Sequence, residues 1–221
     1  MTISNGKTRI AFYGGSFDPL HLGHLFIASR LTTLFNLDEF VFVPAFHAPH
    51  KKRLAPTPAF DRYAMIALAT NNEANISVSK IEIEAPNKPY TVETLTRLNE
   101  LLPDAELFFV MGADSWRDIR TWVEWEKVLS LTNHVIVTRP GFEIVGEHLT
   151  EEIQDRIRDI RGENDPEFPE DEGTRIYFTD AVNLDISATR IREMIRSGDE
   201  AWKNDVPKEV AKYIEKYQIY S

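Results

Sequence analysis

The stretch "RIAFYGGSFDPLHLGH", residues 9–24, decides the fold, because it carries a strand, a turn and the start of a helix. Residues 9–13 form a continuous apolar run, typical of a strand that is covered on both faces. Gly14 and Gly15 end this strand, where glycines permit positive φ and let a ligand approach the backbone closely. After the turn, residues spaced at i, i+4, i+8, i+11 and i+12 form one apolar helix face: Gly23, Ile27, Leu31, Leu34 and Phe35.

The same alternation of strand and helix continues along the chain. Further strands are predicted at residues 39–44, 75–79, 106–112, 134–138 and 175–179. Further helices are predicted at residues 91–103, 122–131, 187–199 and 207–217. Strands that alternate with helices imply right-handed crossovers and a parallel sheet. We therefore expect an α/β fold, a doubly wound (Rossmann-like), mostly parallel sheet with a short C-terminal helical region.

The pattern predicts a single domain over residues 1–221. Its α/β core covers about 7–185, and helices occupy 186–221. Residues 141–174 are predicted to be an inserted, partly helical excursion that ends in the acidic run "GENDPEFPEDEG", 162–173. Such a charge run is typical of a solvated loop.

Composition excludes several classes of protein. The formal net charge of −10 argues against bulk nucleic-acid binding, which needs a basic face, but leaves room for a small phosphorylated ligand at a locally positive site. The sequence has no cysteine, which excludes disulfides, zinc–thiolate sites and thiol chemistry. No apolar run is long enough for a membrane span, and the N-terminus has no signal-peptide pattern. We expect a cytoplasmic protein with no membrane partner.

Two histidines stand at the predicted start of the first helix. His21 and His24 are three residues apart, so they share one helix face beside free backbone N–H groups, which suits phosphate oxygens. A metal site is a competing interpretation, because a second pair, His47 and His50, follows. No glutamate accompanies the first pair as in HExxH, and Pro49 interrupts helical geometry in the second pair. Two histidines that merely satisfy a helix end are the third interpretation.

The stretch "NLDISATRIR", residues 183–192, also follows a predicted strand and opens a helix. Ligands of doubly wound sheets bind beyond the carboxyl ends of the strands, so this stretch and residues 14–24 are expected to meet there. A serine-capped helix start with Arg192 on its second turn can bind an anion, although an ordinary capped helix has the same pattern.

These two stretches carry a family resemblance. "GGSFDPLHLGH", 14–24, resembles the G-G-[ST]-F-D-P-x-H-x-G-H signature of the nucleotidyltransferase superfamily, which moves AMP or CMP onto phosphate groups, and "ISATRIR", 186–192, resembles its second element. The resemblance implies that His21, His24 and Arg192 are catalytic and neutralise charge on a nucleoside triphosphate. It implies an ATP site formed by Gly14, Gly15, Ser16, Phe17, His21, His24, Gly112, Asp114, Ile186, Ser187, Thr189 and Arg192.

The middle of the chain narrows the resemblance. "PHKK" 49–52, "PYTVETL" 89–95, "GADSW" 112–116, "TWVEWEKVL" 121–129 and "TRPG" 138–141 are similar to bacterial nicotinate mononucleotide adenylyltransferases. This implies ATP, with Mg²⁺, and nicotinate mononucleotide as small-molecule substrates, and leaves a homo-oligomer open. The implied pyridine-nucleotide site consists of Asp18, Lys51, Tyr90, Thr91, Trp122 and Arg139. Trp122 would stack on the pyridine ring, although a core position beside Trp116 and Trp125 is the alternative. Asp114 is equally natural as a helix cap. His47 departs from the family segment and receives no role.

Three rival functions remain at this point. The nearest is a related nucleotidyltransferase with another acceptor, such as nicotinamide mononucleotide or phosphopantetheine, or one that uses CTP. A non-catalytic nucleotide-binding protein belongs to a different class, and ATP binding without pyrophosphate release would support it. A histidine metalloprotein is the third, with zinc or iron bound through the four histidines.

Overall fold

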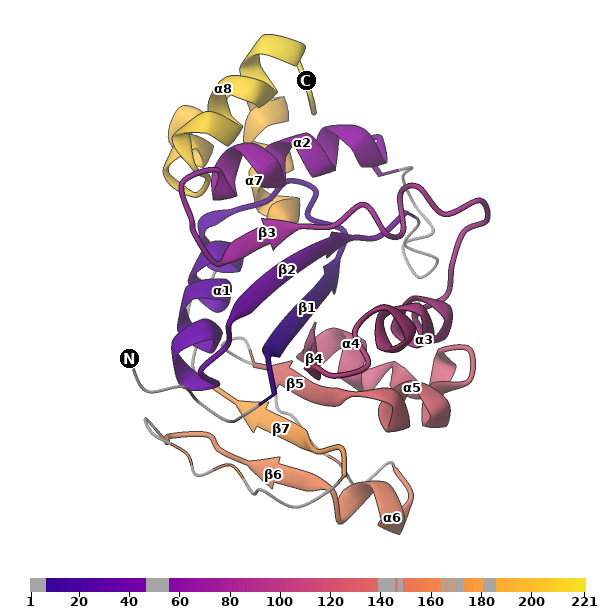
Figure 1. The fold of residues 1–221 in the computed structure, drawn as a ribbon. Coiled ribbons are helices and arrows are strands. Elements are labelled where there is room, and N and C mark those ends of the chain that lie inside the picture. Colours follow the sequence, from indigo (N-terminus) through magenta and orange to yellow (C-terminus); the bar gives the residue numbers. More distant parts are fainter. Residues whose placement is uncertain are drawn as a thin grey trace.

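The computed structural model describes residues 7–46, 56–138, 146, 149–163, 166, 168, 173–180 and 186–221. In this part of the chain one sheet has the strand order β3-β2-β1-β4-β5-β7-β6, and its neighbouring strands pair in parallel (Figure 1). The expected doubly wound, parallel α/β fold is therefore confirmed. The strands are β1 (Arg9–Gly15), β2 (Glu39–Pro44), β3 (Ile76–Val78), β4 (Glu106–Gly112), β5 (Asn133–Val137), β6 (Ile157–Asp159) and β7 (Ile176–Thr179).

Helices cover both faces of the sheet (Figure 1). One face is covered by α1 (Leu22–Leu34) and part of α2 (Ala59–Thr70), and the C-terminal helices α7 (Ala188–Ser197) and α8 (Lys208–Tyr217) pack around α2. The other face is covered by α3 (Thr91–Leu101), α4 (Ala113–Arg117), α5 (Trp125–Leu131) and α6 (Glu151–Gln154). Short 3₁₀ turns are η1 (Ile119–Thr121) and η2 (Glu200–Asn204). None of the helices described is long and apolar enough to cross a membrane.

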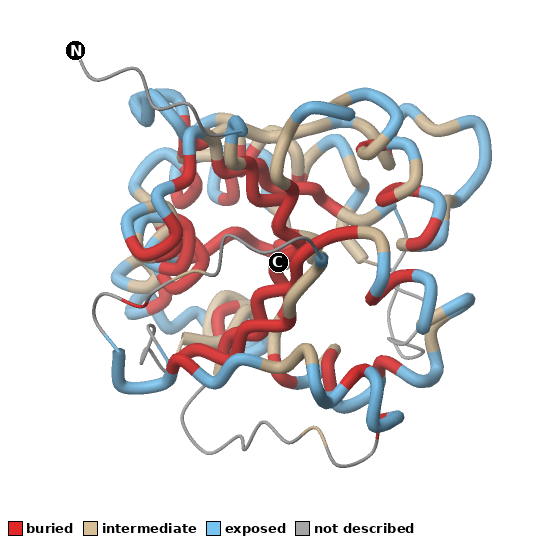
Figure 2. The backbone as a smooth tube through the Cα atoms, turned by 60° about the horizontal axis from the view of Figure 1, so that its bottom comes forward, coloured by how far each residue is buried: buried red, intermediate tan, exposed pale blue. Residues whose placement is uncertain are grey.

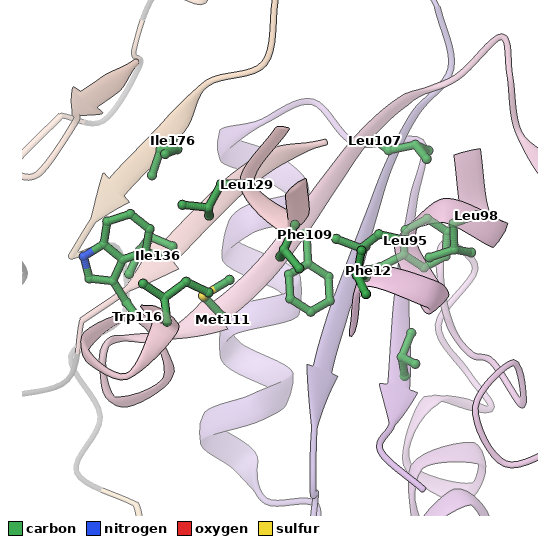
Figure 3. Close-up of a cluster of buried hydrophobic side chains, with 14 of the residues drawn as sticks. Phe12, Leu95, Leu98, Leu107, Phe109, Met111, Trp116, Leu129, Ile136 and Ile176 are labelled. Atoms are coloured by element: carbon green, nitrogen blue, oxygen red, sulfur yellow. The ribbon is translucent and has the colours of Figure 1, made fainter. Parts of the chain in front are cut away.

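Each strand sends alternate side chains to opposite faces, so the apolar runs build two core layers. Phe12 and Phe109 pack with Leu95 of α3 in one layer (Figure 3). Tyr13 and Phe108 belong to the other layer, against α1. Burial of one such aromatic side chain stabilises the fold by about 1.5–3 kcal/mol. Figure 2 shows the result, with burial concentrated along the strands and the inner sides of the helices.

The structure confirms the six predicted strands, with ends that differ by at most two residues, but its helices differ from the prediction in several places. The helix expected at 122–131 begins at Trp125, because Glu124 adopts a left-handed conformation with φ of 49° and cannot continue a right-handed helix toward Trp122. Helix α2 was not expected from the pattern. The predicted insertion contains α6 and also β6, which pairs with β7 as an edge strand.

The strand order reverses direction between β1 and β4. The chain leaves β1 toward β2 through α1 on one face, whereas it reaches β4 from β3 through α3 on the other face. The carboxyl ends of β1 and β4, at Gly15 and Gly112, therefore open between two diverging connections. This crevice is where doubly wound sheets bind their ligands.

Candidate active site

A pocket of about 620 Å³ lies at this crevice, a volume ordinary for a small-molecule site. Its lining includes nearly all the described residues that the sequence predicts for the site: Gly14, Gly15, Ser16, Phe17, Asp18, His21, His24, Tyr90, Thr91, Gly112, Asp114, Trp122, Ser187, Thr189 and Arg192. Ile186 does not line the pocket and instead packs on the cluster of C-terminal helices. Lys51 and Arg139 lie outside the described residues, as do His47 and His50.

The loop after β1 is shaped by ring contacts rather than by glycine backbone freedom. Positive φ falls on Phe17, at 47°, and not on Gly14 or Gly15, so these glycines do not use the positive φ that their residue type permits, whereas both line the pocket. A Cβ on Gly14 would lie 2.8 Å from the ring of Phe109, and one on Gly15 would lie 2.8 Å from the ring of Phe17. Both glycines are therefore needed for close packing. Phe17 is held in its unfavourable conformation by burial between Tyr13, Phe42 and His24.

The two histidines form one stacked unit at the start of α1. Their ring centroids are 3.6 Å apart, and both side chains are buried, at 2% and 7% exposure for His21 and His24. The backbone N–H of His21 donates to Nδ1 of His24 at 3.2 Å. With Nδ1 as acceptor, the neutral His24 ring carries its proton on Nε2, which is then a hydrogen-bond donor. Gly23 makes room for this arrangement, because a Cβ there would lie 3.1 Å from the His21 ring.

The two helix starts at the pocket differ in what they offer an anion. In α1 the N–H of Leu22 donates to the carbonyl of Asp205 at 2.9 Å, so the expected set of free N–H groups is wrong at this position. In α7 the N-cap is Ser187, whose hydroxyl makes no capping hydrogen bond. Ala188 and Thr189 follow it in the pocket lining, and first-turn N–H groups have no acceptor within their own helix. The start of α7 is thus the better anion site of the two.

Arg192 joins the two motifs across the pocket. Its Nη1 donates to the carbonyl oxygen of Asp18 at 2.6 Å, and its Nη2 donates to the hydroxyl of Thr189 at 3.3 Å. A guanidinium has five N–H donors, so further donors remain for phosphate oxygens. The arrangement gives the acidic chain a local cation beside two imidazoles and a helix start.

The opposite wall has the character of a heterocycle site. Tyr90 is the N-cap of α3, and Thr91 is the first residue of that helix. The N–H of Tyr90 donates to the Glu93 carboxylate at 2.7 Å, which fixes the start of the helix. Trp122 both lines the pocket and packs against the core layer that contains Trp116. The two interpretations of Trp122 are therefore compatible, because one face of an indole can pack while another is offered to a ligand.

The comparison with protein families agrees with this geometry. The model described as "Cytidylyltransferase-like" matches residues 12–194, which include both motifs of the pocket. The chain belongs to the cytidylyltransferase-like family.

Curated relatives match this chain over nearly its whole length or all of it. A protein of Corynebacterium jeikeium (strain K411), named "Probable nicotinate-nucleotide adenylyltransferase", is 37% identical over 94% of this chain and 98% of its own length. A protein of Desulfitobacterium hafniense (strain Y51) with the same name is 37% identical over 100% of this chain and 99% of its own. The family resemblance that the motifs indicate is confirmed.

Solved structures agree on the fold. The Plasmodium falciparum nicotinic acid mononucleotide adenylyltransferase complexed with APC superposes with a TM-score of 0.70 at 22% identity, covering 96% of this chain and 97% of that one. The same enzyme complexed with NaAD gives the same values.

In this cytidylyltransferase-like chain, Gly112 rather than Asp114 occupies the N-cap of α4, so the interpretation of Asp114 as the capping residue is wrong. Asp114 lies in the first turn, and a Cβ on Gly112 would approach its Oδ1 to 2.7 Å. Gly112 therefore allows this carboxylate to fold back beside the end of β4, within the pocket lining.

Sequence reasoning missed several pocket residues, of which Glu82 is the most informative. Glu82 accepts hydrogen bonds from the Thr94 hydroxyl at 3.0 Å and from the N–H of Phe46 at 3.3 Å. Burial raises the pKa of its carboxyl, against the opposing effect of these hydrogen bonds. In the sequence, Glu82 is distinguished only as a carboxylate that stands between Ile81 and Ile83. The other missed lining residues include Ala45, Ser115, Asp118, Thr121 and Val123.

The described residues contain no group of three or more His, Asp or Glu side chains able to hold a metal ion. His21 and His24 contact each other ring to ring.

A second hollow, of about 480 Å³, lies between β3 and α3 and contains none of the predicted site residues.

Proposed function

We propose that this chain transfers AMP from Mg²⁺-bound ATP to the 5′-phosphate of nicotinate mononucleotide, giving deamido-NAD and pyrophosphate, in the cytoplasm. The observation that supports it best is the meeting of residues 14–24 and 186–192 at one pocket whose opposite wall is Tyr90, Thr91 and Trp122. The names of the full-length relatives and the NaAD bound to the Plasmodium enzyme agree with this substrate pair.

The reaction is an in-line displacement at phosphorus. An oxygen of the acceptor's 5′-phosphate forms a bond to the α-phosphorus of ATP, and the bond from that phosphorus to the bridging β-phosphate oxygen breaks. The electron pair leaves with pyrophosphate. Because the attacking phosphate is already an anion at neutral pH, the reaction needs no general base, so catalysis is positioning and charge neutralisation.

The chain's residues divide between the two substrates. His21, His24, Arg192 and the start of α7, with Ser187 and Thr189, neutralise charge that moves onto the leaving pyrophosphate. Gly14 to Phe17 and Gly112 with Asp114 hold the adenosine and phosphates. Tyr90, Thr91 and Trp122, with Lys51 and Arg139, receive the pyridine nucleotide. The sequence places Asp18 with the residues that receive the pyridine nucleotide. In the structure its carboxylate accepts hydrogen bonds from Tyr220 and Thr57 and its backbone carbonyl accepts one from Arg192, so the role we propose for it is to position Arg192.

Pyrophosphate release with ATP and Mg²⁺ tests the proposal when nicotinate mononucleotide, its amide and phosphopantetheine are compared as acceptors. We expect release with nicotinate mononucleotide, and loss of roughly 10²–10³-fold in kcat for His24→Ala and Arg192→Ala. Arg190→Ala is the matched control, since Arg190 is exposed on the same helix and does not line the pocket. Absence of release with either pyridine nucleotide would contradict the proposal.

A further inference from the structure

The end of the chain reaches the loop that follows β1. Beyond α8, Gln218 and Tyr220 have positive φ of 52° and 73°, which turns the last residues back toward the molecule (Figure 1). Ile219 and Tyr220 then pack on the cluster that joins α2, α7 and α8. The half-buried Tyr220 hydroxyl donates to Oδ1 of Asp18 at 2.7 Å, across 202 positions of sequence.

Asp18 is held from three directions by this arrangement. Tyr220 bonds one carboxylate oxygen, and the N–H of Thr57 donates to the other at 3.4 Å. Arg192 donates to the backbone carbonyl of Asp18 at 2.6 Å. That hydrogen bond is the shorter of the two that the Arg192 guanidinium makes, the other being to the Thr189 hydroxyl, and Arg192 lines the pocket where the triphosphate is proposed to bind.

The hydroxyl of Tyr220 remains a donor at every physiological pH. Burial and the neighbouring Asp18 carboxylate both raise the pKa of Tyr220, because an ionised phenolate there would be poorly solvated and repelled. A donor bonded to a charged acceptor makes one of the stronger hydrogen bonds in proteins.

We propose that Tyr220 is a positioning residue for the triphosphate site, which fixes Arg192 through Asp18. This inference rests on the proposed role of Arg192 and adds the C-terminal tail to the ATP site. Tyr220 touches no substrate in this scheme. Loss of its hydroxyl therefore changes the affinity for ATP only by allowing Arg192 to move.

A double-mutant cycle tests whether Tyr220 affects ATP binding through Arg192. The affinity for the Mg²⁺ complex of a non-hydrolysable ATP analogue is measured by calorimetry for the full chain, Tyr220→Phe, Arg192→Ala and the double variant. We expect Tyr220→Phe to weaken binding by about 10-fold, the scale of one hydrogen bond to a charged group. In the Arg192→Ala background the same change is expected to have less than a twofold effect. A further tenfold loss there would overturn the proposal.

Control variants distinguish a positioning role of Tyr220 from a loss of overall stability. Tyr217→Phe removes a hydroxyl from the exposed side of the same C-terminal segment and is expected to leave affinity unchanged. In Tyr220→Phe the KM for nicotinate mononucleotide is expected to stay within twofold of the value for the unaltered chain. A general loss of structure would instead weaken the binding of both substrates. A chain that ends at Ile219 is expected to match or exceed the loss in Tyr220→Phe, and wild-type affinity in this truncated chain would overturn the inference.

The outcomes for the two proposals are distinct. If the wild-type chain releases pyrophosphate but Tyr220→Phe binds the analogue normally, the inference fails and the proposed function stands. If the wild-type chain binds the analogue but transfers nothing to nicotinate mononucleotide, the proposed function fails and the cycle still decides the role of Tyr220. If the wild-type chain binds no ATP analogue, both are overturned.

Discussion

At the scale of single residues, His134 of β5 makes stability depend on pH. Its side chain is fully buried, Nδ1 lies 3.0 Å from the Thr132 carbonyl, and Nε2 has no hydrogen-bond partner among the described residues. Burial lowers the pKa of His134 from 6.5 to about 3. Below pH 6.5 the unfolded chain binds a proton that the folded chain cannot, so stability present above this pH is lost as pH falls toward 3.

We expect this residue alone to remove about 2 kcal/mol of unfolding free energy between pH 7 and pH 5. His134→Leu is expected to flatten the pH dependence by that amount, measured by urea unfolding at a series of pH values. An unchanged difference between pH 7 and pH 5 in the variant would show that other groups carry the dependence.

Trp122 gives a second prediction at this scale. Trp122→Ala is expected to raise the KM for nicotinate mononucleotide by about 5- to 100-fold, the scale of one aromatic stacking contact, and to leave ATP affinity within twofold. Steady-state kinetics with each substrate varied in turn measures this split. Trp122→Phe keeps an aromatic face and is the control, and a selective loss of ATP binding would place the indole in the other half of the pocket.

Individual contacts explain why the sequence predicts residue types better than residue roles. The pair His21 and His24 follows from its spacing, whereas their ring stacking depends on the missing side chain of Gly23. The local pattern of Glu82, a carboxylate between two isoleucines, does not predict its hydrogen bonds, because its partners Phe46 and Thr94 come from other segments of the chain.

At the scale of elements, Arg62 connects α2 to three segments around the pocket. It is 1% exposed, and it donates to the carbonyls of Ser16 and Ala45 at 2.7 Å each and of Thr57 at 2.9 Å. Desolvation lowers the pKa of Arg62, yet a guanidinium stays protonated near neutrality, so its charge strengthens all three bonds.

Arg62→Met is expected to lower the unfolding free energy by roughly 2–4 kcal/mol, because buried carbonyls lose their donor. The unfolding free energy of Arg62→Lys is expected to lie between those of the unaltered chain and Arg62→Met, since one ammonium cannot reach three separate carbonyls. Urea unfolding measures both, with the exposed Arg97→Met as control. Unaltered stability in Arg62→Met would mean that the three carbonyls find water instead.

The elements also show what pattern alone can predict. Continuous apolar runs identify β1, β2, β4, β5 and β7, because strands buried on both faces need them. Helix α5 begins later than its pattern because the left-handed Glu124 interrupts it. The short β6 has only one of its three residues partly buried, so its pairing with β7 depends on the finished sheet rather than on its own composition.

At the scale of the whole molecule, the sheet order brings together motifs from the two ends of the chain. The loop after β1 and the start of α7 meet only in the folded state, through the contact between Asp18 and Arg192. A chain with formal charge −10 thus places the Arg192 guanidinium, two imidazoles and a helix start beside one another at one crevice, an arrangement that an unfolded chain would lack. A ligand that needs both motifs therefore binds the folded state alone.

This linkage predicts stabilisation by nucleotide. At a free concentration 100 times its Kd, a ligand that binds only the folded chain adds about 2.7 kcal/mol to the unfolding free energy. For a chain of this size that corresponds to a rise in Tm of roughly 5–10 °C. We expect this rise with the Mg²⁺ complex of a non-hydrolysable ATP analogue, measured by calorimetry, and at the same concentration expect Arg192→Ala to lose most of it while Arg190→Ala retains it. Equal shifts in the two variants would mean that ATP is held by the β1 side of the pocket without the second motif.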